Sequence, residues 1–203
     1  MLLDRVREEA LSRLQGATIE RVCAAKVAVA LLSDGRLGVA SMLAAAGAAD
    51  AARRLRGADA AAVAAGLRRE SGQLERSLSL AVVNAAASPL AACCDDEGSL
   101  PLPRADDVVT VIGYIAQVVT AMRSRAGRLY VFDDSLSEGV LPRCRQRECL
   151  EASDAVYVSG SAFANATIDE VVQAASRARL VAIVGPSTPL HPRAFSGSPV
   201  TML

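Results

Sequence analysis

Apolar residues recur at helical spacing at the start of the chain and at strand spacing shortly afterwards. Residues 2–15 place their apolar side chains on one stripe with Arg and Glu between them, which predicts an amphipathic helix that ends at Gly16. Runs rich in β-branched residues then flank a Ser-Asp-Gly turn. They predict a hairpin of residues 26–32 and 36–41, beside which residues 18–23 are a candidate third strand.

An Ala-rich stretch separates this hairpin from the strongest helix pattern of the first half. Residues 44–70 are interrupted by three glycines, so we expect short helices joined at glycine corners. Since Ala buries little surface, this part should be weakly packed. Residues 71–87 carry an apolar face and predict a helix with Ser71 as its N-cap. The side chains of that face are Leu74, Leu78, Ala81, Val82 and Ala85.

The pattern changes after a segment that is rich in proline and acidic residues. We interpret residues 91–107 as a linker between a small α+β domain at residues 1–90 and a second domain at residues 108–203. In the second domain strands alternate with helices, which is typical of a Rossmann-like parallel sheet and makes the fold class α/β. The predicted strands span residues 107–114, 128–132, 155–159 and 180–184, and the predicted helices lie near residues 115–126, 143–151 and 167–177.

Composition excludes several classes of partner. The chain has 22 Lys and Arg against 22 Asp and Glu, and only 3% of its residues are aromatic. Neither value suits a nucleic-acid surface, which needs an excess of cations and aromatic rings for base stacking. No apolar run reaches the roughly 18 residues of a membrane helix, and the N-terminus lacks the pattern of a signal peptide. We therefore expect a cytoplasmic protein without nucleic-acid or membrane partners.

The cysteines do not form a recognisable metal or disulfide pattern. Cys93 and Cys94 are adjacent, Cys144 and Cys149 are five residues apart, and Cys23 stands alone. Structural zinc sites use closely spaced Cys pairs with an intervening gap of two to four residues. The sequence therefore predicts free thiols in a reducing compartment.

Chemistry-bearing residues follow each predicted strand of the second domain. Because the carboxyl ends of parallel strands meet at one edge of a sheet, we expect four loop tips to converge on one crevice. The residues at those tips are Gly113, Tyr114, Asp133, Asp134, Ser159, Gly160, Ser161, Asn165, Thr167, Gly185, Pro186, Ser187 and Thr188.

The carboxylate pair at the second strand end is compatible with two kinds of ligand. In nucleotide-binding sheets an acidic residue at this position holds the ribose hydroxyls. Asp133 and Asp134 also suit a hard metal ion or a general base, and a solvated loop needs neither. Gly113 lacks the further glycines of a dinucleotide fingerprint, so a pyrophosphate loop is poorly supported.

The string GPSTPL at residues 185–190 is the most unusual one in the chain. Two prolines fix the backbone around a Ser-Thr pair that offers hydroxyls and N–H donors to an anion. Thr188 suits the N-cap of a short helix that begins at Pro189. A functional loop and a rigid connection both explain the string, and we expect the functional loop.

Three further polar residues were weighed as site candidates. His191, the only histidine, stands in what the sequence indicates is an exposed turn, so we assign it no role. Glu75 lies on the helix of residues 71–87 and either pairs with a nearby Arg or faces the second domain. Asn84, in the apolar run of the same helix, must find buried partners and is the better candidate.

Four stretches of the chain together resemble a known prokaryotic family, described as a heavy-metal chelation domain of unknown function. They are LERSLSLAVVNAAAS (74–88), VTVIGY (109–114), VSGSAFANATIDEVV (158–172) and LVAIVGPSTPLHPRAF (180–195). The resemblance extends over essentially the whole chain, and GPSTPL is its most specific element. It implies an N-terminal domain similar to the N-terminal fold of enolase, a Rossmann-like second domain and a bacterial source.

The resemblance also implies which positions form the site. The family's acidic and Asn positions on the first-domain helix match Glu75 and Asn84, and its strand-end acid matches Asp133 or Asp134. Its Asn-x-Thr pair matches Asn165 and Thr167. Relatives usually carry Gly-His after the first strand of the second domain, where this chain has Gly113 and Tyr114.

Two functions follow from these observations. The first is a metal or metal-chelate handling protein whose site lies in the cleft between the domains, with a divalent metal ion on Asp133 and Asp134 and further oxygen donors from Glu75 and Thr188. The alternative is an enzyme that binds a nucleotide-like ligand or S-adenosylmethionine at the strand ends. A scaffold with a vestigial cleft is a third possibility. We expect a small molecule or metal chelate as partner and a homodimer, since the Ala-rich first domain is weakly packed.

Overall fold

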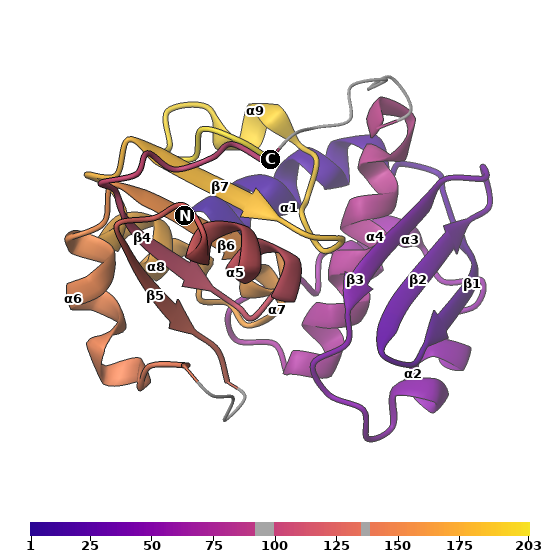
Figure 1. The fold of residues 1–203 in the computed structure, drawn as a ribbon. Coiled ribbons are helices and arrows are strands. Elements are labelled where there is room, and N and C mark those ends of the chain that lie inside the picture. Colours follow the sequence, from indigo (N-terminus) through magenta and orange to yellow (C-terminus); the bar gives the residue numbers. More distant parts are fainter. Residues whose placement is uncertain (92–99, 135–138) are drawn as a thin grey trace.

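The structure, a computed structural model, describes residues 1–91, 100–134 and 139–203. The first half contains a three-stranded antiparallel sheet in the order β1-β2-β3 (Figure 1). The predicted hairpin, the third strand beside it and the short helices of the Ala-rich stretch are all confirmed. The elements of this half are α1 (Leu2–Arg13), β1 (Ile19–Ala24), β2 (Val27–Leu32), β3 (Leu37–Ser41), α2 (Ala48–Arg54), α3 (Ala60–Ala64) and α4 (Gln73–Ala91).

The second half contains a four-stranded parallel sheet in the order β5-β4-β6-β7. Three of its strands have the bounds that the sequence predicts, and the α/β fold class is confirmed. The elements are β4 (Val108–Ile112), α5 (Ala116–Arg123), β5 (Arg128–Phe132), the 3-10 helix η1 (Arg143–Arg145), α6 (Gln146–Glu151), β6 (Ala155–Ser159), α7 (Ser161–Ala164), α8 (Ile168–Ala174), β7 (Leu180–Val184) and α9 (Pro192–Phe195).

The parallel sheet is buried on both faces, as its continuous apolar runs predict. Side chains alternate between the faces along each strand. In β6, Ala155 and Tyr157 lie in a core that also contains the apolar side chains of α5. Val156 and Val158 belong to the other core, which reaches α8 and continues into the first half of the chain. The sheet is thus the middle layer of the second half.

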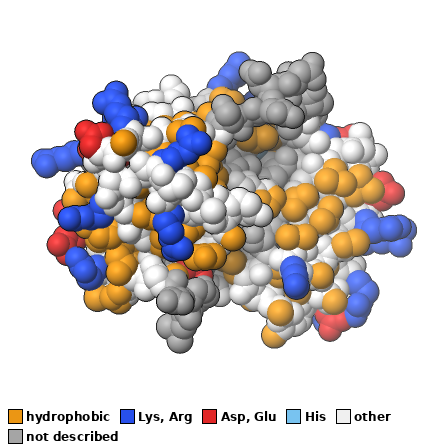
Figure 2. All heavy atoms as spheres, viewed as in Figure 1, with side chains coloured by type: hydrophobic (Ala, Val, Ile, Leu, Met, Phe, Trp, Pro, Cys, Tyr) orange, Lys and Arg blue, Asp and Glu red, His pale blue; other side chains and the backbone are white. Residues whose placement is uncertain are grey.

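The antiparallel sheet is packed closely on α4, which stands between this sheet and the rest of the molecule (Figure 1). Gly38 permits the close approach, since a Cβ at this position would lie 2.1 Å from the backbone O of Ala81 and N of Ala85. The other face of the sheet is only partly covered in the described structure. Val27 and Leu37 are exposed there, and Figure 2 shows apolar side chains gathered over these strands.

Contacts between the two halves run through α1 and α4. Helix α1 packs against α9 and α8 of the second half as well as against α4. On α4, the buried Arg76 donates from Nε to the carbonyl of Ala164 at 2.6 Å. Of the predicted linker, residues 92–99 lie outside the described residues, and residues 100–107 have no regular secondary structure. The domain boundary itself stays a prediction.

The N-cap predicted for α4 is wrong. The helix begins at Gln73, two residues after Ser71. Arg76 explains the difference, because its guanidinium donates to the carbonyls of Ser71 and Arg69 and so organises the turn that precedes the helix. None of the helices in the described ranges is both long and apolar enough to cross a lipid bilayer.

Candidate ligand site at the strand ends

A polar pocket opens at the carboxyl ends of β4, β5 and β6. Its volume is about 70 Å³. It lies where the sheet changes direction, because β4 is followed through α5 by β5 on one side and has β6 as its other neighbour. Ligands of open α/β sheets bind at such points. The lining residues are Ile112, Gly113, Phe132, Asp133, Asp134, Leu141, Arg143, Gln146, Ser159, Ser161, Ala162, Asn165 and Thr167.

The first wall of the pocket joins the ends of β4 and β5. Asp133 is half-buried, and its Oδ2 accepts a hydrogen bond from the backbone N–H of Tyr114 at 2.7 Å. Gly113 has φ +88°, and a Cβ there would lie 2.6 Å from Cβ of Ser159. A glycine is therefore required for the loop after β4 to approach the end of β6. Asp134, the next residue, is exposed at the pocket mouth.

Hydroxyl and amide groups form the opposite wall. Ser161 donates from both its backbone N–H and its Oγ to Oγ of Ser159, at 3.3 and 2.9 Å. Asn165 accepts at Oδ1 from Nε2 of Gln73 at 3.1 Å, which ties the start of α4 to the pocket. Thr167 precedes α8 and makes no side-chain cap bond to that helix. This wall offers uncharged oxygen atoms.

Two lining residues were not predicted from the sequence. Arg143 is exposed and forms no ion pair with any residue of the described ranges, and Gln146 follows one turn later. The pocket thus has a carboxylate pair and a guanidinium among its walls. The available signal was the basic run at the start of the helix predicted near residues 143–151, because a helix that follows a parallel strand begins near the carboxyl edge of the sheet.

The GPSTPL loop, which follows β7 of the parallel sheet, does not line this pocket. It forms hydrogen bonds to β3 of the antiparallel sheet instead. Ser187 is buried, and its Oγ accepts from the backbone N–H of Ser41 in β3 at 2.7 Å and donates to Oγ of Ser41 at 2.8 Å. Thr188 donates from Oγ1 to the carbonyl of Gly185 at 2.7 Å. A Cβ on Gly160 would lie 2.4 Å from the backbone N of Thr188, so the loop also presses on the end of β6.

Three of the four predicted strand ends therefore share one pocket. Gly185, Pro186 and Thr188, after the fourth strand, line a separate and largely apolar cavity of about 340 Å³ with Leu190 and Leu203. The predicted N-cap role of Thr188 is wrong, because α9 begins at Pro192 and not at Pro189. The hydroxyl of Thr188 bonds within its own loop instead.

The expectation that His191 lies in an exposed turn is also wrong. The side chain is fully buried, and Nε2 lies 2.9 Å from the carbonyl oxygen of Val83 in α4. Burial lowers the pKa of His191 below its ordinary value, against the raising effect of the hydrogen bond to Val83. The sequence suggested exposure because two prolines flank the residue, and it did not show that α9 folds back onto α1.

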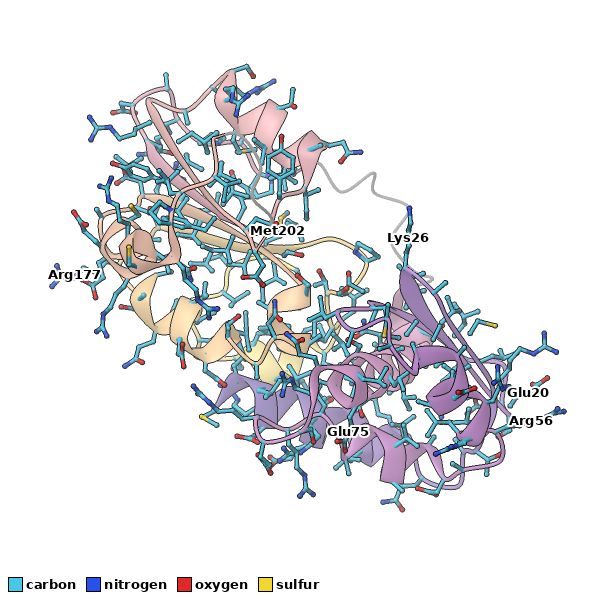
Figure 3. All side chains as sticks on the ribbon, turned by 90° about the horizontal axis from the view of Figure 1, so that it is seen from below. Glu20, Lys26, Arg56, Glu75, Arg177 and Met202 are labelled. Carbon is cyan, nitrogen blue, oxygen red and sulfur yellow. The ribbon has the colours of Figure 1, made fainter. Side chains whose placement is uncertain are left out.

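Glu75 and Asn84 lie outside the pocket. Asn84 donates from Nδ2 to the carbonyl of Val39 at 2.7 Å, whereas its buried Oδ1 has no hydrogen-bond partner among the described residues, so the side chain is only half satisfied. Glu75 lines another cavity, of about 420 Å³, together with Ser79 and the turn after α3. Figure 3 shows Glu75 on α4, among the helices of the first half. Neither side chain joins Asp133.

The donor set around the pocket limits what an ion could find there. Within the described residues, no group of three or more His, Cys, Asp or Glu side chains is placed to hold a metal ion. Of the cysteines, Cys23, Cys144 and Cys149 are free thiols as predicted, and burial raises the pKa of the Cys149 thiol. Cys93 and Cys94 lie outside the described residues.

Solved structures of similar fold come from two prokaryotes. A protein of unknown function of the DUF364 family from Pyrococcus horikoshii superposes with a TM-score of 0.82 at 20% identity, covering 100% of this chain and 86% of that one. A DUF364 protein of unknown function from Desulfitobacterium hafniense has a TM-score of 0.77 at 19% identity, covering 95% of this chain and 81% of that one. At these identities the likeness establishes the fold.

Sequence comparison adds a curated relative and two family models. An uncharacterized protein of Methanocaldococcus jannaschii is 33% identical over 137 residues, which are 63% of this chain and 52% of the relative. The matched region thus spans about half the length of that relative. Residues 7–87 match the DUF4213 model and residues 101–203 the DUF364 model, both described as "Putative heavy-metal chelation". The chain therefore belongs to this "Putative heavy-metal chelation" family.

Proposed function

We propose that this chain binds a divalent metal ion, as cargo, together with a small oxygen-rich chelator at the strand-end pocket. The observation that carries the proposal is that two consecutive residues, Asp133 and Asp134, both line a polar pocket of about 70 Å³. That volume suits an ion with a few donor atoms and is far below the roughly 300 Å³ at which small-molecule sites begin. The family description supports a metal as the ligand.

The chemistry of the donors explains why a chelator belongs in the proposal. Carboxylate, hydroxyl and amide oxygens suit hard cations, whereas heavier transition metals prefer imidazole or thiolate ligands. As possible metal ligands, the side chains of the pocket walls supply only carboxylate, hydroxyl and amide oxygens. A transition metal that arrives already complexed needs few ligands from the protein, so two carboxylates are enough to hold it.

The charges of the pocket fit such a complex. Asp133 and Asp134 are negative, and Arg143 is positive and without an ion-pair partner among the described residues. A metal complex of a carboxylic acid presents both signs of charge. Its cation would face the aspartates while a chelator carboxylate would face the guanidinium, which binds carboxylates in a two-pronged geometry. We therefore place the site on these residues rather than on Glu75 or Thr188.

The test is a titration of the purified chain with Mn²⁺, Co²⁺, Ni²⁺ and Zn²⁺, each alone and as its citrate complex. Asp134→Asn keeps the shape of the side chain and removes its charge. We expect it to weaken binding of the metal–citrate complex at least about tenfold, the loss typical of perturbed metal sites. Calorimetry measures the affinity.

The matched control is Asp106→Asn, which removes an exposed carboxylate before β4, at the opposite edge of the sheet. It should bind the complex like the unmodified chain. Equal affinities of Asp134→Asn and Asp106→Asn, or an unmodified chain that binds no metal in either form, would falsify the proposal.

A nucleotide-like ligand or S-adenosylmethionine is the second candidate. The favouring observation is that Asp133 ends β5 next to Gly113 on β4, where nucleotide-binding sheets hold ribose. One observation weighs against it: the pocket is small for an adenosine. Titration with adenosine, adenosine phosphates and S-adenosylmethionine separates the two, since a binding heat from any of these, with none from metal complexes, selects this candidate.

A further inference from the structure

We infer that the groove between α6 and α8 binds the anionic arm of the chelator, and that this chelator is a small polycarboxylate. The inference rests on the proposed function and names the class of molecule that accompanies the metal. The groove has a volume of about 250 Å³. Arg143, Gln146 and Thr167 line both the groove and the strand-end pocket, so the two spaces adjoin along these side chains.

The charges of the groove favour an anion. Arg143 and Arg147 both line it, and Glu170 is the acidic residue among its walls. Glu170 pairs with Arg69 from the first half, although this pair is also exposed, so the walls carry two arginines against one acidic side chain. Arg147 pairs with Glu151 at 2.8 Å, but its side chain is 82% exposed, and such surface pairs are weak. An arriving carboxylate therefore meets one guanidinium, that of Arg143, with no ion pair to the described residues, and a second, that of Arg147, which can exchange its partner at low cost.

The floor of the groove favours an organic anion over an inorganic one. Leu150 and Val171 are buried beneath it and present an apolar surface, with Ala174 half-buried beside them. Gln146 and Gln173 place amide groups among the walls. An apolar floor with cationic and amide walls matches a short carbon chain that bears several carboxylates. The space is near the lower end of the size range of small-molecule sites.

In this arrangement the strand-end pocket binds the metal ion and the adjoining groove binds the carboxylates of the chelator. The aspartates after β5 take the cation, and Arg143, shared by pocket and groove, takes the carboxylate nearest to the metal. Arg147, which lines only the groove, takes a more distant one. Loss of an arginine should therefore weaken binding of a metal–polycarboxylate complex without changing how the bare ion binds.

The experiment uses Ni²⁺ alone, citrate alone and the Ni²⁺–citrate complex as probes, with affinities from calorimetry. Arg143→Gln should weaken the complex about tenfold, the loss expected for charge-assisted hydrogen bonds. Arg147→Gln should weaken it about threefold, since Arg147 must exchange Glu151 for the chelator and lines only the groove. The binding of Ni²⁺ alone should not change in either variant. The control is Arg177→Gln. Arg177 is exposed and precedes β7, so it lies at the amino ends of the strands, opposite the pocket (Figure 3).

The outcomes separate this inference from the proposed function. If Asp134→Asn loses the complex while Arg143→Gln and Arg147→Gln bind it like Arg177→Gln, neither arginine holds the chelator and the groove is not its site, but metal binding at the aspartates of the strand-end pocket stands. If Arg143→Gln weakens Ni²⁺ alone as much as the complex, Arg143 supports the metal pocket and the inference is overturned. An unmodified chain that binds neither Ni²⁺ nor its complex overturns both.

Discussion

The two sheets of this molecule differ in how they are covered. The parallel sheet of the second half carries the candidate site, whereas the antiparallel sheet of the first half packs beside it and carries none of the lining residues. The parallel sheet is buried on both faces, and its strands all end at one edge, so the loops that carry Asp133 and Ser159 meet there. The antiparallel sheet is covered on one face by α4, and its strands turn back on themselves. Helix α4 and the GPSTPL loop connect this sheet to the second half, which carries the site.

The strongest test of this comparison is to force the antiparallel sheet away from α4. A Cβ on Gly38 would lie 2.1 Å from two backbone atoms of that helix, which no side-chain movement can relieve. We expect Gly38→Ala to lower the free energy of unfolding by about 3 kcal/mol, the upper part of the range for overpacked cores. Urea denaturation measures the change.

Gly72→Ala is the matched control, since a Cβ there meets no atom within 4 Å. It should change the stability by no more than about 0.5 kcal/mol. If the two variants are equally stable, β3 does not pack on α4 as closely as described, and the antiparallel sheet is not fixed against this helix.

A smaller effect is expected from cutting the link between the GPSTPL loop and β3. Ser187→Ala leaves the backbone N–H of Ser41, a half-buried residue, without the acceptor that it now has at 2.7 Å. An unsatisfied buried donor costs about 1–3 kcal/mol, and partial burial places this one in the lower half of that range, so we expect a loss of about 1.5 kcal/mol in the free energy of unfolding. Ser12→Ala, which removes an exposed hydroxyl on α1, should be nearly neutral. A neutral Ser187→Ala would show that the loop does not fasten the sheets.

Ser187 also shows where prediction from the sequence reaches its limit. The apolar runs bounded by turn residues predicted the strands at residues 128–132, 155–159 and 180–184 with the bounds that the structure has. The shared edge of a parallel sheet then predicted correctly that Asp133 and Ser159 would line one pocket. Both results follow from local pattern and topology alone.

The residues that were misjudged depend on how the two halves pack. Ser187 and Thr188 follow β7 like the other candidates follow their strands, but β3 lies against their loop and takes up the hydroxyl of Ser187. His191 is buried because α9 returns to α1. Arg143 was overlooked because a basic run at the start of a helix resembles a solvated surface. No local pattern reports a contact between segments more than a hundred residues apart.

The smallest expected effect is a pH dependence of the free energy of unfolding. It arises from the contact of His191 with α4, which also joins the two halves. His191 is fully buried against Val83 of α4, and burial lowers its pKa in the folded chain. In the unfolded chain the pKa is the ordinary value of about 6.5. As the pH falls below that value, the unfolded state takes up a proton that the folded state refuses. The free energy of unfolding therefore decreases from there down to the folded-state pKa, and the unfolded-state value limits the loss between pH 7 and pH 5.5 to at most about 1.3 kcal/mol.

His191→Gln tests this, because its amide can donate to the carbonyl of Val83 but carries no titratable proton. Urea denaturation of both chains between pH 7 and pH 5.5 gives two slopes, and the carboxylates contribute equally to each. The free energy of unfolding should fall more steeply with decreasing pH in the unmodified chain than in the variant. Glu9 and Arg13 of α1 act on the ring electrostatically with opposite sign, so they leave the direction to burial. Because only the slopes are compared, a variant that is less stable by the same amount at every pH still decides the question. Equal slopes of the two chains would show that water reaches His191 where the segment after β7 packs on α4.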